Sequence, residues 1–159
     1  MDRADHVALF KGVSGAPPAT DLLLLPGWSD ADWNKVLDRT RPRPYRASEV
    51  IIQRGAADCE LYFVVAGSLE VGITQVDGVS FVPLARITAG SVVGEQSFLD
   101  GQPRSANVWG VSDGGLLRLE LEDFHRFGRE EPALARDMLF ALARVLSLRL
   151  RNTTVRVRR

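Results

Sequence analysis

The stretch of sequence that decides the fold is GSVVGEQSFLDGQPRSANVW, residues 90–109. It lies between two strand-like segments and is punctuated by glycines, which mark corners of the chain. Residues 95–99 predict a short helical turn, and Asp100-Gly101 predicts a turn that returns the chain toward it. Pro103-Arg104-Ser105 then leads into the next strand. We refer to residues 93–106 as the cassette.

The residue types of the cassette favour binding of an anion. The start of a helix offers free backbone N–H groups and the positive end of a dipole, and Gly94 has no side chain to block an approaching group. Arg104 can add two parallel hydrogen bonds and Ser105 a hydroxyl, while Glu95 supplies an acceptor beside them. A site with several donors and one acid suits a ligand that carries both a negative group and a hydroxyl. A ribose phosphate fits that description.

The cassette resembles the phosphate-binding segment of the cyclic-nucleotide-binding domain family. The matching residues are Val93-Gly94-Glu95, then four residues, a short glycine turn, and Pro103-Arg104-Ser105-Ala106. Val93 departs from the usual Phe. The resemblance covers about residues 21–152, and its other landmarks follow in order: Gly55, the LYFVVAG run at 61–67, Gly90, the apolar segment at 116–119, Phe124 and Pro132.

The resemblance implies a role for each cassette residue. Arg104 would pair with the exocyclic oxygens of the cyclic phosphate, and Glu95 would accept from the ribose 2′-hydroxyl. Ser105 and the backbone around the start of the helical turn would complete the site. The expected ligand is cAMP, with cGMP as the alternative, and no cofactor is expected. The expected ligand-binding residues are Gly94, Glu95, Gln96, Arg104, Ser105, Ala106 and Arg149.

Arg149 enters through a departure from the family. By ungapped counting from Arg104, the adenine-binding Thr-Ser pair of bacterial cAMP-responsive activators falls on Arg149 and Leu150. The polar contacts to the base are therefore missing. Arg149 can instead stack over the base as a cation–π cover, which predicts weak selection between adenine and guanine.

Short strands between turn residues dominate the chain from Tyr45 to Leu121. Asp77-Gly78 predicts a hairpin with a type I′ turn. The fold class is α+β: an antiparallel β-roll or jelly roll, as in the double-stranded β-helix of the cyclic-nucleotide-binding fold, flanked by N-terminal and C-terminal helices. The domain division is an N-terminal extension at 1–20, a ligand-binding domain at 21–152 and a basic tail at 153–159.

The flanking helices are predicted from capping residues and apolar periodicity. Ser29 caps a helix over residues 29–40, which the prolines that follow should end. A short helix is predicted over 121–128 and a longer one over 131–151. Residues 12–20 are small and rich in helix breakers, so we expect a loose segment there after an optional terminal turn.

The last helix leaves two interpretations open. Its apolar residues form a stripe broader than one buried face requires: Leu134, Ala135, Met138, Leu139, Leu142, Val145, Leu146 and Leu150. It packs on the roll alone, or it also forms the seam of a homodimer. Few residues follow Arg151, too few for a helix-turn-helix, so we expect a stand-alone sensor with an unknown effector protein. A fold that has lost its ligand and acts as a protein-interaction module is the alternative.

Composition excludes several other functions. The 20 basic and 20 acidic residues cancel, which argues against a nucleic-acid or membrane partner, although six arginines crowd the last sixteen residues. His6 and His125 are the only histidines, so neither a metal site nor a catalytic triad is expected, and the chain is not predicted to be an enzyme. The single Cys59, the absence of a signal peptide and the short apolar runs favour the cytoplasm.

Overall fold

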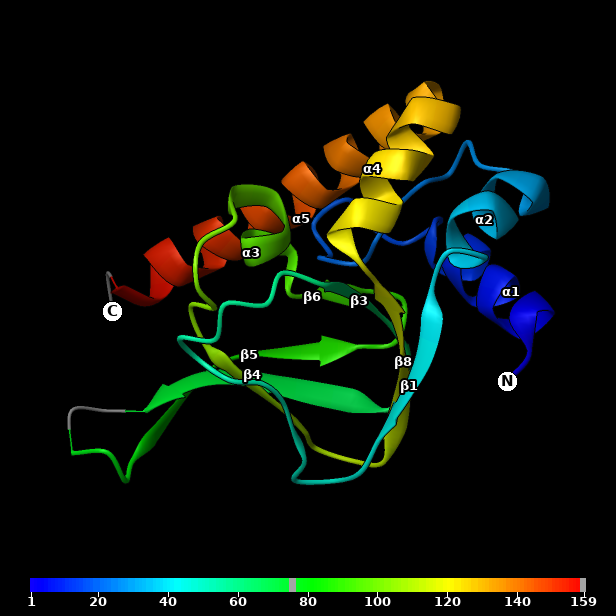
Figure 1. Cartoon of the computed structure of the whole chain (residues 1–159). Helices are drawn as coiled ribbons and strands as arrows, with labels where there is room; N and C mark the ends of the chain where they lie inside the picture. The colour runs from blue at the N-terminus through cyan, green and yellow to red at the C-terminus, as the bar shows by residue number, and fades with distance from the viewer. Residues whose placement is uncertain (75–76, 158–159) are drawn as a thin grey trace. The chain divides into compact units, whose positions relative to one another are not determined.

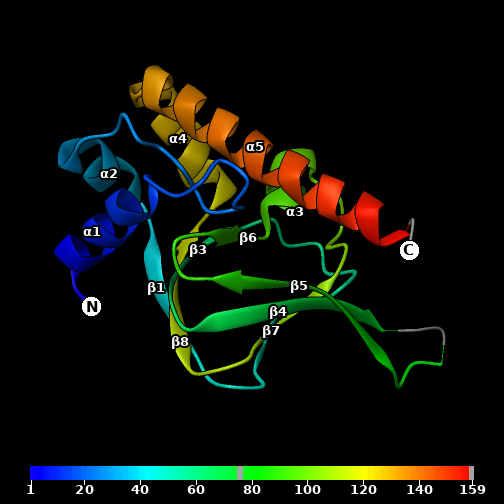
Figure 2. The same cartoon turned by 180° about the vertical axis from the view of Figure 1, so that it is seen from behind.

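The chain forms two compact units, which we describe separately. The computed structural model describes residues 1–74 and 77–157 (Figure 1). The roll unit is the central segment, Pro42–Arg118, and the helical unit combines the two ends of the chain, Met1–Arg41 and Leu119–Arg159. Figure 2 shows from behind that the strands gather in the roll unit and the long helices in the helical unit.

The roll unit contains two four-stranded sheets, in the orders β1-β8-β3-β6 and β2-β7-β4-β5. The pairs β3–β6, β2–β7, β4–β5 and β4–β7 are antiparallel, which confirms the predicted antiparallel β-roll. The strands are β1 (Arg41–Tyr45), β2 (Val50–Ile52), β3 (Leu61–Ala66), β4 (Ser68–Thr74), β5 (Phe81–Thr88), β6 (Val92–Val93), β7 (Asn107–Gly110) and β8 (Gly114–Leu119). The helix α3 (Glu95–Asp100) lies between β6 and β7.

Apolar side chains from both sheets fill the core of the roll. On β4, Leu69 is fully buried between partly exposed neighbours, as the predicted alternation requires, but the next buried residue is Gly72 rather than Val71, because the pairing with β5 is irregular there. On β3 every residue from Leu61 to Val65 is buried, so both faces of this strand are covered. The core cluster consists of Tyr45, Ile52, Tyr62, Val64, Leu69, Ile87, Val93, Val108 and Leu116.

The sheet begins earlier than the sequence indicates. The prolines at 42 and 44 were expected only to end the preceding helix, but the segment Arg41–Tyr45 is itself the strand β1. Proline lacks the N–H that a central strand must donate, so it is tolerated mainly at sheet edges. Because β1 is an edge strand of its sheet, the prolines fit there.

The hairpin between β4 and β5 is present, since Thr74 pairs with Phe81. Gly78 has φ of 71°, and the Asp77 carboxylate accepts hydrogen bonds from the backbone of Val79 and Ser80, at 3.0 and 2.9 Å. Such bonds from an Asp side chain to the following backbone are common in turns. The type I′ turn predicted at Asp77-Gly78 also depends on residue 76, which lies outside the described residues.

The helical unit contains α1 (Arg3–Val13), α2 (Asp30–Leu37), α4 (Leu121–Glu130) and α5 (Pro132–Val157). Its aromatic core joins the first two helices, since the rings of Phe10 and Trp33 stack at 4.9 Å. Trp28 packs edge-on against Trp33 and donates its indole N–H to Asp137 of α5 at 3.2 Å. Ser29 caps α2 as predicted, in a capping box with Asp32.

The N-terminal segment is more ordered than predicted. In place of an optional turn, α1 is an eleven-residue helix with its own capping box. Residues 18–22 are also held in place, because Arg144 of α5 donates to the carbonyl oxygens of Pro18, Thr20 and Leu22. The small residues of this segment could not reveal these bonds, because their partner is an arginine more than 120 positions away.

The last helix extends beyond its predicted end at residue 151, through the basic tail to Val157. Arg158 and Arg159 lie outside the described residues. Within the part of the chain that the structure describes, no helix has the length and apolar content needed to cross a membrane.

Adjacent glycines of β8 provide a test of core packing. A Cβ on Gly114 would lie 2.3 Å from both the Ala66 carbonyl oxygen and the Tyr45 hydroxyl, whereas one on Gly115 would meet only a Val65 methyl at 3.6 Å. We expect Gly114→Ala to destabilise the protein by about 3 kcal/mol, because backbone must shift. Urea unfolding measures the loss. Gly115→Ala is the matched control, and equal stability of the two variants would contradict the packing.

Candidate functional site

The cassette has the predicted order of strand, short helix, glycine turn and strand. The strand β6 ends at Val93, and Gly94 turns the chain into α3 with φ of 84°. The helix ends at Gly101, which also has positive φ, at 69°. Only glycine adopts this left-handed conformation at little cost, so the two glycines fix both corners of the cassette.

Arg104 is the buried centre of the cassette. Only 3% of the residue is exposed. Its Nη1 donates to the Gly94 carbonyl oxygen at 2.9 Å, and its Nη2 donates to the Glu60 carbonyl oxygen at 2.7 Å. Its Nε and Nη2 donate to one carboxylate oxygen of Asp58, at 3.2 and 2.8 Å. The guanidinium therefore joins the start of α3 to the segment that precedes β3.

The backbone of Arg104 is fixed to the same segment. Its N–H donates to the Ala56 carbonyl oxygen at 2.8 Å, and its carbonyl oxygen accepts from the N–H of Gly55 at 2.8 Å. Beside it, the Asn107 side chain accepts from the N–H of Arg54 at 2.8 Å. Hydrogen bonds within the roll unit therefore hold both the backbone and the side chain of Arg104 in place.

Two carboxylates beside Arg104 were missed by the sequence analysis. Asp58 forms the ion pair at 2.8 Å, and a Glu60 carboxylate oxygen lies 3.8 Å from the same nitrogen. The hydrogen bond from Arg104 lowers the pKa of the Asp58 carboxyl below its ordinary value, against the opposing effect of burial. The only signal in the sequence was the pair of acids on either side of Cys59, directly before a buried strand.

The close approach of Arg104 requires glycine at position 94. A Cβ there would lie 2.8 Å from the Arg104 Nη1 and 2.8 Å from the Glu60 carbonyl oxygen. Gly94 is therefore needed twice, for its φ angle and for the space that the guanidinium occupies.

The structure brings most of the predicted cassette residues together. Ser105 donates its hydroxyl hydrogen to the Gln96 side-chain oxygen, so α3 and the loop after it are joined. Glu95 is 6% exposed at the first position of α3, and Ala106 is half-buried just before β7. Arg149 belongs to the helical unit, where its Nε donates to the Asp21 carboxylate at 3.0 Å.

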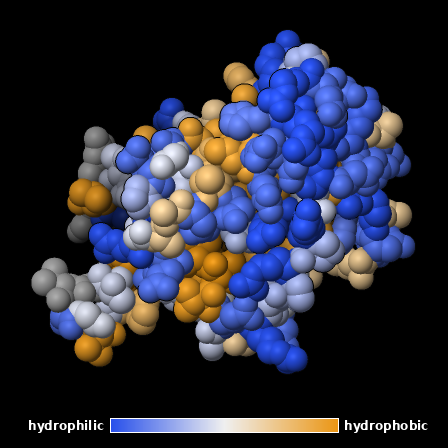
Figure 3. Space-filling model, viewed as in Figure 1, coloured by the Kyte–Doolittle hydropathy of each residue, from blue (hydrophilic) through white to orange (hydrophobic). Residues whose placement is uncertain are grey.

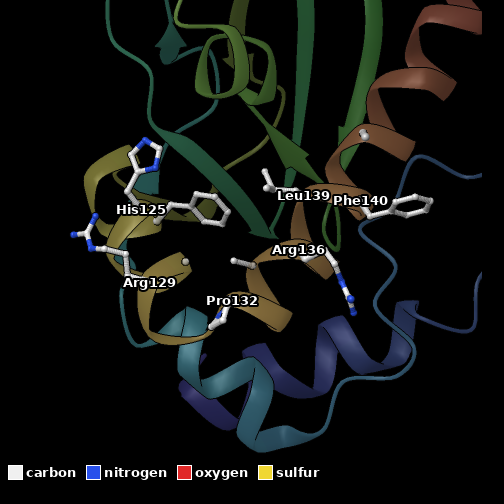
Figure 4. A pocket seen from close by; sticks show the side chains of 10 residues that line it. His125, Arg129, Pro132, Arg136, Leu139 and Phe140 are labelled. Carbon is white, nitrogen blue, oxygen red and sulfur yellow. The ribbon is translucent and has the colours of Figure 1, made fainter.

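The helical unit has a groove of its own, of about 710 Å³, between α4 and α5. Figure 4 shows His125 and Arg129 on the α4 side, and Leu139 and Phe140 on the α5 side. Phe124 adds to its apolar lining, and Arg136 adds a third basic group. None of the residues predicted to bind ligand lines this groove. Within the described residues, no three His, Cys, Asp or Glu side chains cluster as a metal site requires.

A two-sheet roll with a buried arginine in a loop–helix–turn segment defines a ligand-binding regulatory domain. The chain belongs to the cyclic nucleotide-binding domain family, whose sequence model matches residues 42–131. The match covers the whole roll unit and continues through α4. It confirms the resemblance that the cassette suggests.

Known proteins of several kinds share this domain. The chain is 31% identical over 123 residues to the cyclic AMP receptor protein of Thermus thermophilus, covering 77% of this chain and 56% of that protein. It is 28% identical over 101 residues to a cyclic nucleotide-gated potassium channel of Rhizobium etli, covering 64% of this chain and 26% of the channel. The chain thus spans only part of these relatives' length.

A solved cyclic nucleotide-binding domain from Methylobacillus flagellatus has the same fold. It superimposes with a TM-score of 0.79 at 18% identity, covering 95% of this chain and 83% of that one. At this identity the likeness establishes the fold alone, and it confirms the predicted roll with flanking helices.

The two glycines of the cassette yield a second prediction. Gly94→Ala and Gly101→Ala both place a side chain at positive φ, but a Cβ at Gly101 meets no atom within 4 Å. We expect Gly101→Ala to cost about 1 kcal/mol of unfolding free energy and Gly94→Ala about 3 kcal/mol, since the latter also displaces Arg104. Denaturant unfolding of both variants measures the difference. Equal losses of unfolding free energy would mean that position 94 requires glycine only for its positive φ, and not for the space beside Arg104.

Proposed function

We propose that this chain is a sensor that binds a cyclic nucleotide, with cAMP as its ligand, and passes the binding signal to an effector through its last helix. The observation that carries the proposal is the buried guanidinium of Arg104, fixed against the Gly94 carbonyl at 2.9 Å in a chain of the cyclic nucleotide-binding family. The single free Cys59 supports a cytoplasmic location.

The proposed roles follow the chemistry of each cassette residue. Arg104 pairs with the cyclic phosphate, which would share the guanidinium N–H donors with the oxygens of Asp58, Gly94 and Glu60. Glu95 accepts from the ribose 2′-hydroxyl, since a carboxylate offers only acceptors. Ser105 and the backbone N–H groups of residues 94–96 add further donors, and the small Ala106 leaves room beside them.

Arg149 is the proposed contact for the base. Stacking by a guanidinium depends on the π-face of a purine rather than on its hydrogen-bonding edge, so it discriminates adenine from guanine weakly. Its pairing with Asp21 at 3.0 Å sets a condition on this role, because the ligand must share the arginine or replace that partner. We therefore expect cGMP to bind as well, within about tenfold of cAMP.

A second copy of the chain is the proposed partner of α5. We name Phe140, Ala143, Ser147, Leu150, Thr154 and Val157 the α5 stripe, and all six are exposed. Their spacing alternates three and four residues, which keeps them on one face of a helix and is typical of a coiled-coil seam. Phe140 is 79%, Leu150 68% and Val157 82% exposed. Association of two α5 stripes would bury these apolar side chains.

The α5 stripe provides a third prediction. Leu150→Glu places a charge in the middle of the seam, and we expect it to convert a dimer to a monomer, which light scattering after size-exclusion chromatography detects. The matched control is Val79→Glu at the tip of the β4–β5 hairpin, where Val79 is 81% exposed and Figure 3 shows hydrophobic atoms. A wild-type monomer at high micromolar concentration would contradict the proposed partner.

One observation favours the alternative of an interaction module without nucleotide. The guanidinium of Arg104 already donates to Asp58, Gly94 and Glu60, so the fold has a use for this arginine without a ligand. The two functions differ in one measurable respect, which is whether the pure protein binds cyclic nucleotides in calorimetry.

The fourth prediction tests the proposed ligand through Arg104. Arg104→Lys keeps the positive charge beside Asp58 and Glu60 but loses the planar fork, so the protein should fold and bind cAMP at least about tenfold more weakly. Calorimetric titration with cAMP and cGMP measures both affinities. Arg86→Lys is the control, because Arg86 is exposed and only loosely paired with Glu70, at 3.9 Å.

Binding by Arg104→Lys within threefold of the wild type would exclude Arg104 from the site. Failure of the wild type to bind either nucleotide would favour the interaction module.

A further inference from the structure

The ionisable groups around Arg104 are acidic, whereas a site that binds anions by charge alone would be surrounded by basic groups. One guanidinium faces two carboxylates, with Asp58 at 2.8 Å and Glu60 at 3.8 Å from the same nitrogen. Glu95, also an acid, is 6% exposed one residue after the Gly94 carbonyl that Arg104 contacts. Two carboxyl groups, those of Asp58 and Glu60, therefore lie against the single guanidinium of Arg104.

Arg104 would therefore hold a phosphate mainly by directed hydrogen bonds, because the neighbouring carboxylates offset its electrostatic attraction for the ligand. A phosphate that shares its N–H donors would face the carboxylates across the guanidinium, at a distance on the order of 6 Å. Each negative charge on the ligand is repelled by these carboxylates, and because the Asp58 side chain is 39% exposed and the Glu60 side chain 25% exposed, water and salt screen part of that repulsion. A second ligand charge adds repulsion without adding donors.

We propose that Asp58 and Glu60 are specificity-determining residues that restrict the site to phosphodiester monoanions and reject phosphomonoester dianions. The inference rests on the proposed function and deepens it. A cyclic nucleotide carries one negative charge on its phosphodiester, whereas the linear nucleotide from ring opening carries nearly two at neutral pH. The two acids thereby allow the site to distinguish a cyclic ligand from its hydrolysis product by charge, in addition to shape.

The two carboxylates can be neutralised without loss of their shape. Asp58→Asn retains an oxygen that can accept from Arg104, and Glu60→Gln leaves untouched the Glu60 backbone carbonyl that accepts from it at 2.7 Å. Glu70→Gln is the matched control, because Glu70 is an acid of the same roll unit whose ion-pair partner is Arg86. This variant removes one negative charge, as the other two do, but leaves the surroundings of Arg104 unchanged.

The experiment compares cAMP, 5′-AMP and the methyl ester of 5′-AMP, which is a linear monoanion, as competitors of a fluorescent cyclic nucleotide. In the wild type, we expect the methyl ester to compete at least about tenfold better than 5′-AMP. In Asp58→Asn and in Glu60→Gln, 5′-AMP should gain about fivefold or more, while cAMP gains about twofold. Glu70→Gln should retain the wild-type pattern.

The outcomes separate this inference from the function on which it rests. If the wild type binds no cyclic nucleotide, both are overturned. If cAMP binds but neither variant gains affinity for 5′-AMP, including the case in which 5′-AMP never competes, the charge restriction is overturned and the sensor remains. Parallel loss of all ligands in both variants would likewise overturn it, because the acids would then only position Arg104.

Discussion

The roll depends on keeping one guanidinium out of water. A buried arginine cannot lose its charge, so every N–H it turns inward must meet an acceptor at the right distance. Here the acceptors come from the Gly94 carbonyl, the Glu60 carbonyl and the Asp58 carboxylate. Moving any of these segments would leave at least one buried N–H group of Arg104 without its acceptor. The position of α3 and the path of residues 55–60 are therefore fixed by the same side chain.

This constraint has a consequence for how a ligand is recognised. Because Arg104 is held at both its backbone and its side chain, a phosphate bound at the proposed site would cost little conformational entropy there. In that proposal the unfavourable contributions to binding are electrostatic and arise from the neighbouring carboxylates. The charge of the ligand would then matter more for its affinity than the ordering of a loop.

The sequence predicted what depends on local pattern. Alternation located β4, the glycines located the corners of α3, and Ser29 located the start of α2. The ordered cassette was enough to place the chain in its family. Spacing could also place Gln96 and Ser105 on neighbouring segments, which the structure joins by a hydrogen bond.

The features that the sequence did not predict depend on distant partners. Asp58 and Arg104 are 46 positions apart, and Arg144 meets residues 18–22 across more than 120 positions, so no local window contains both members. The strand β1 was missed because its prolines suit an edge that only the sheet order reveals.

The division of the helical unit between the two ends of the chain bears on the order of folding during synthesis. All strands of the roll have been synthesised once residue 119 is made, so their pairing needs no residue that follows. By contrast, Trp28 and Lys35 have their partners in Asp137 and Glu131, which are made after the whole roll. The stacking of Phe10 on Trp33 needs only α1 and α2, so these helices can pack on each other early, whereas their contacts with residues 131–137 must form after the roll has been synthesised.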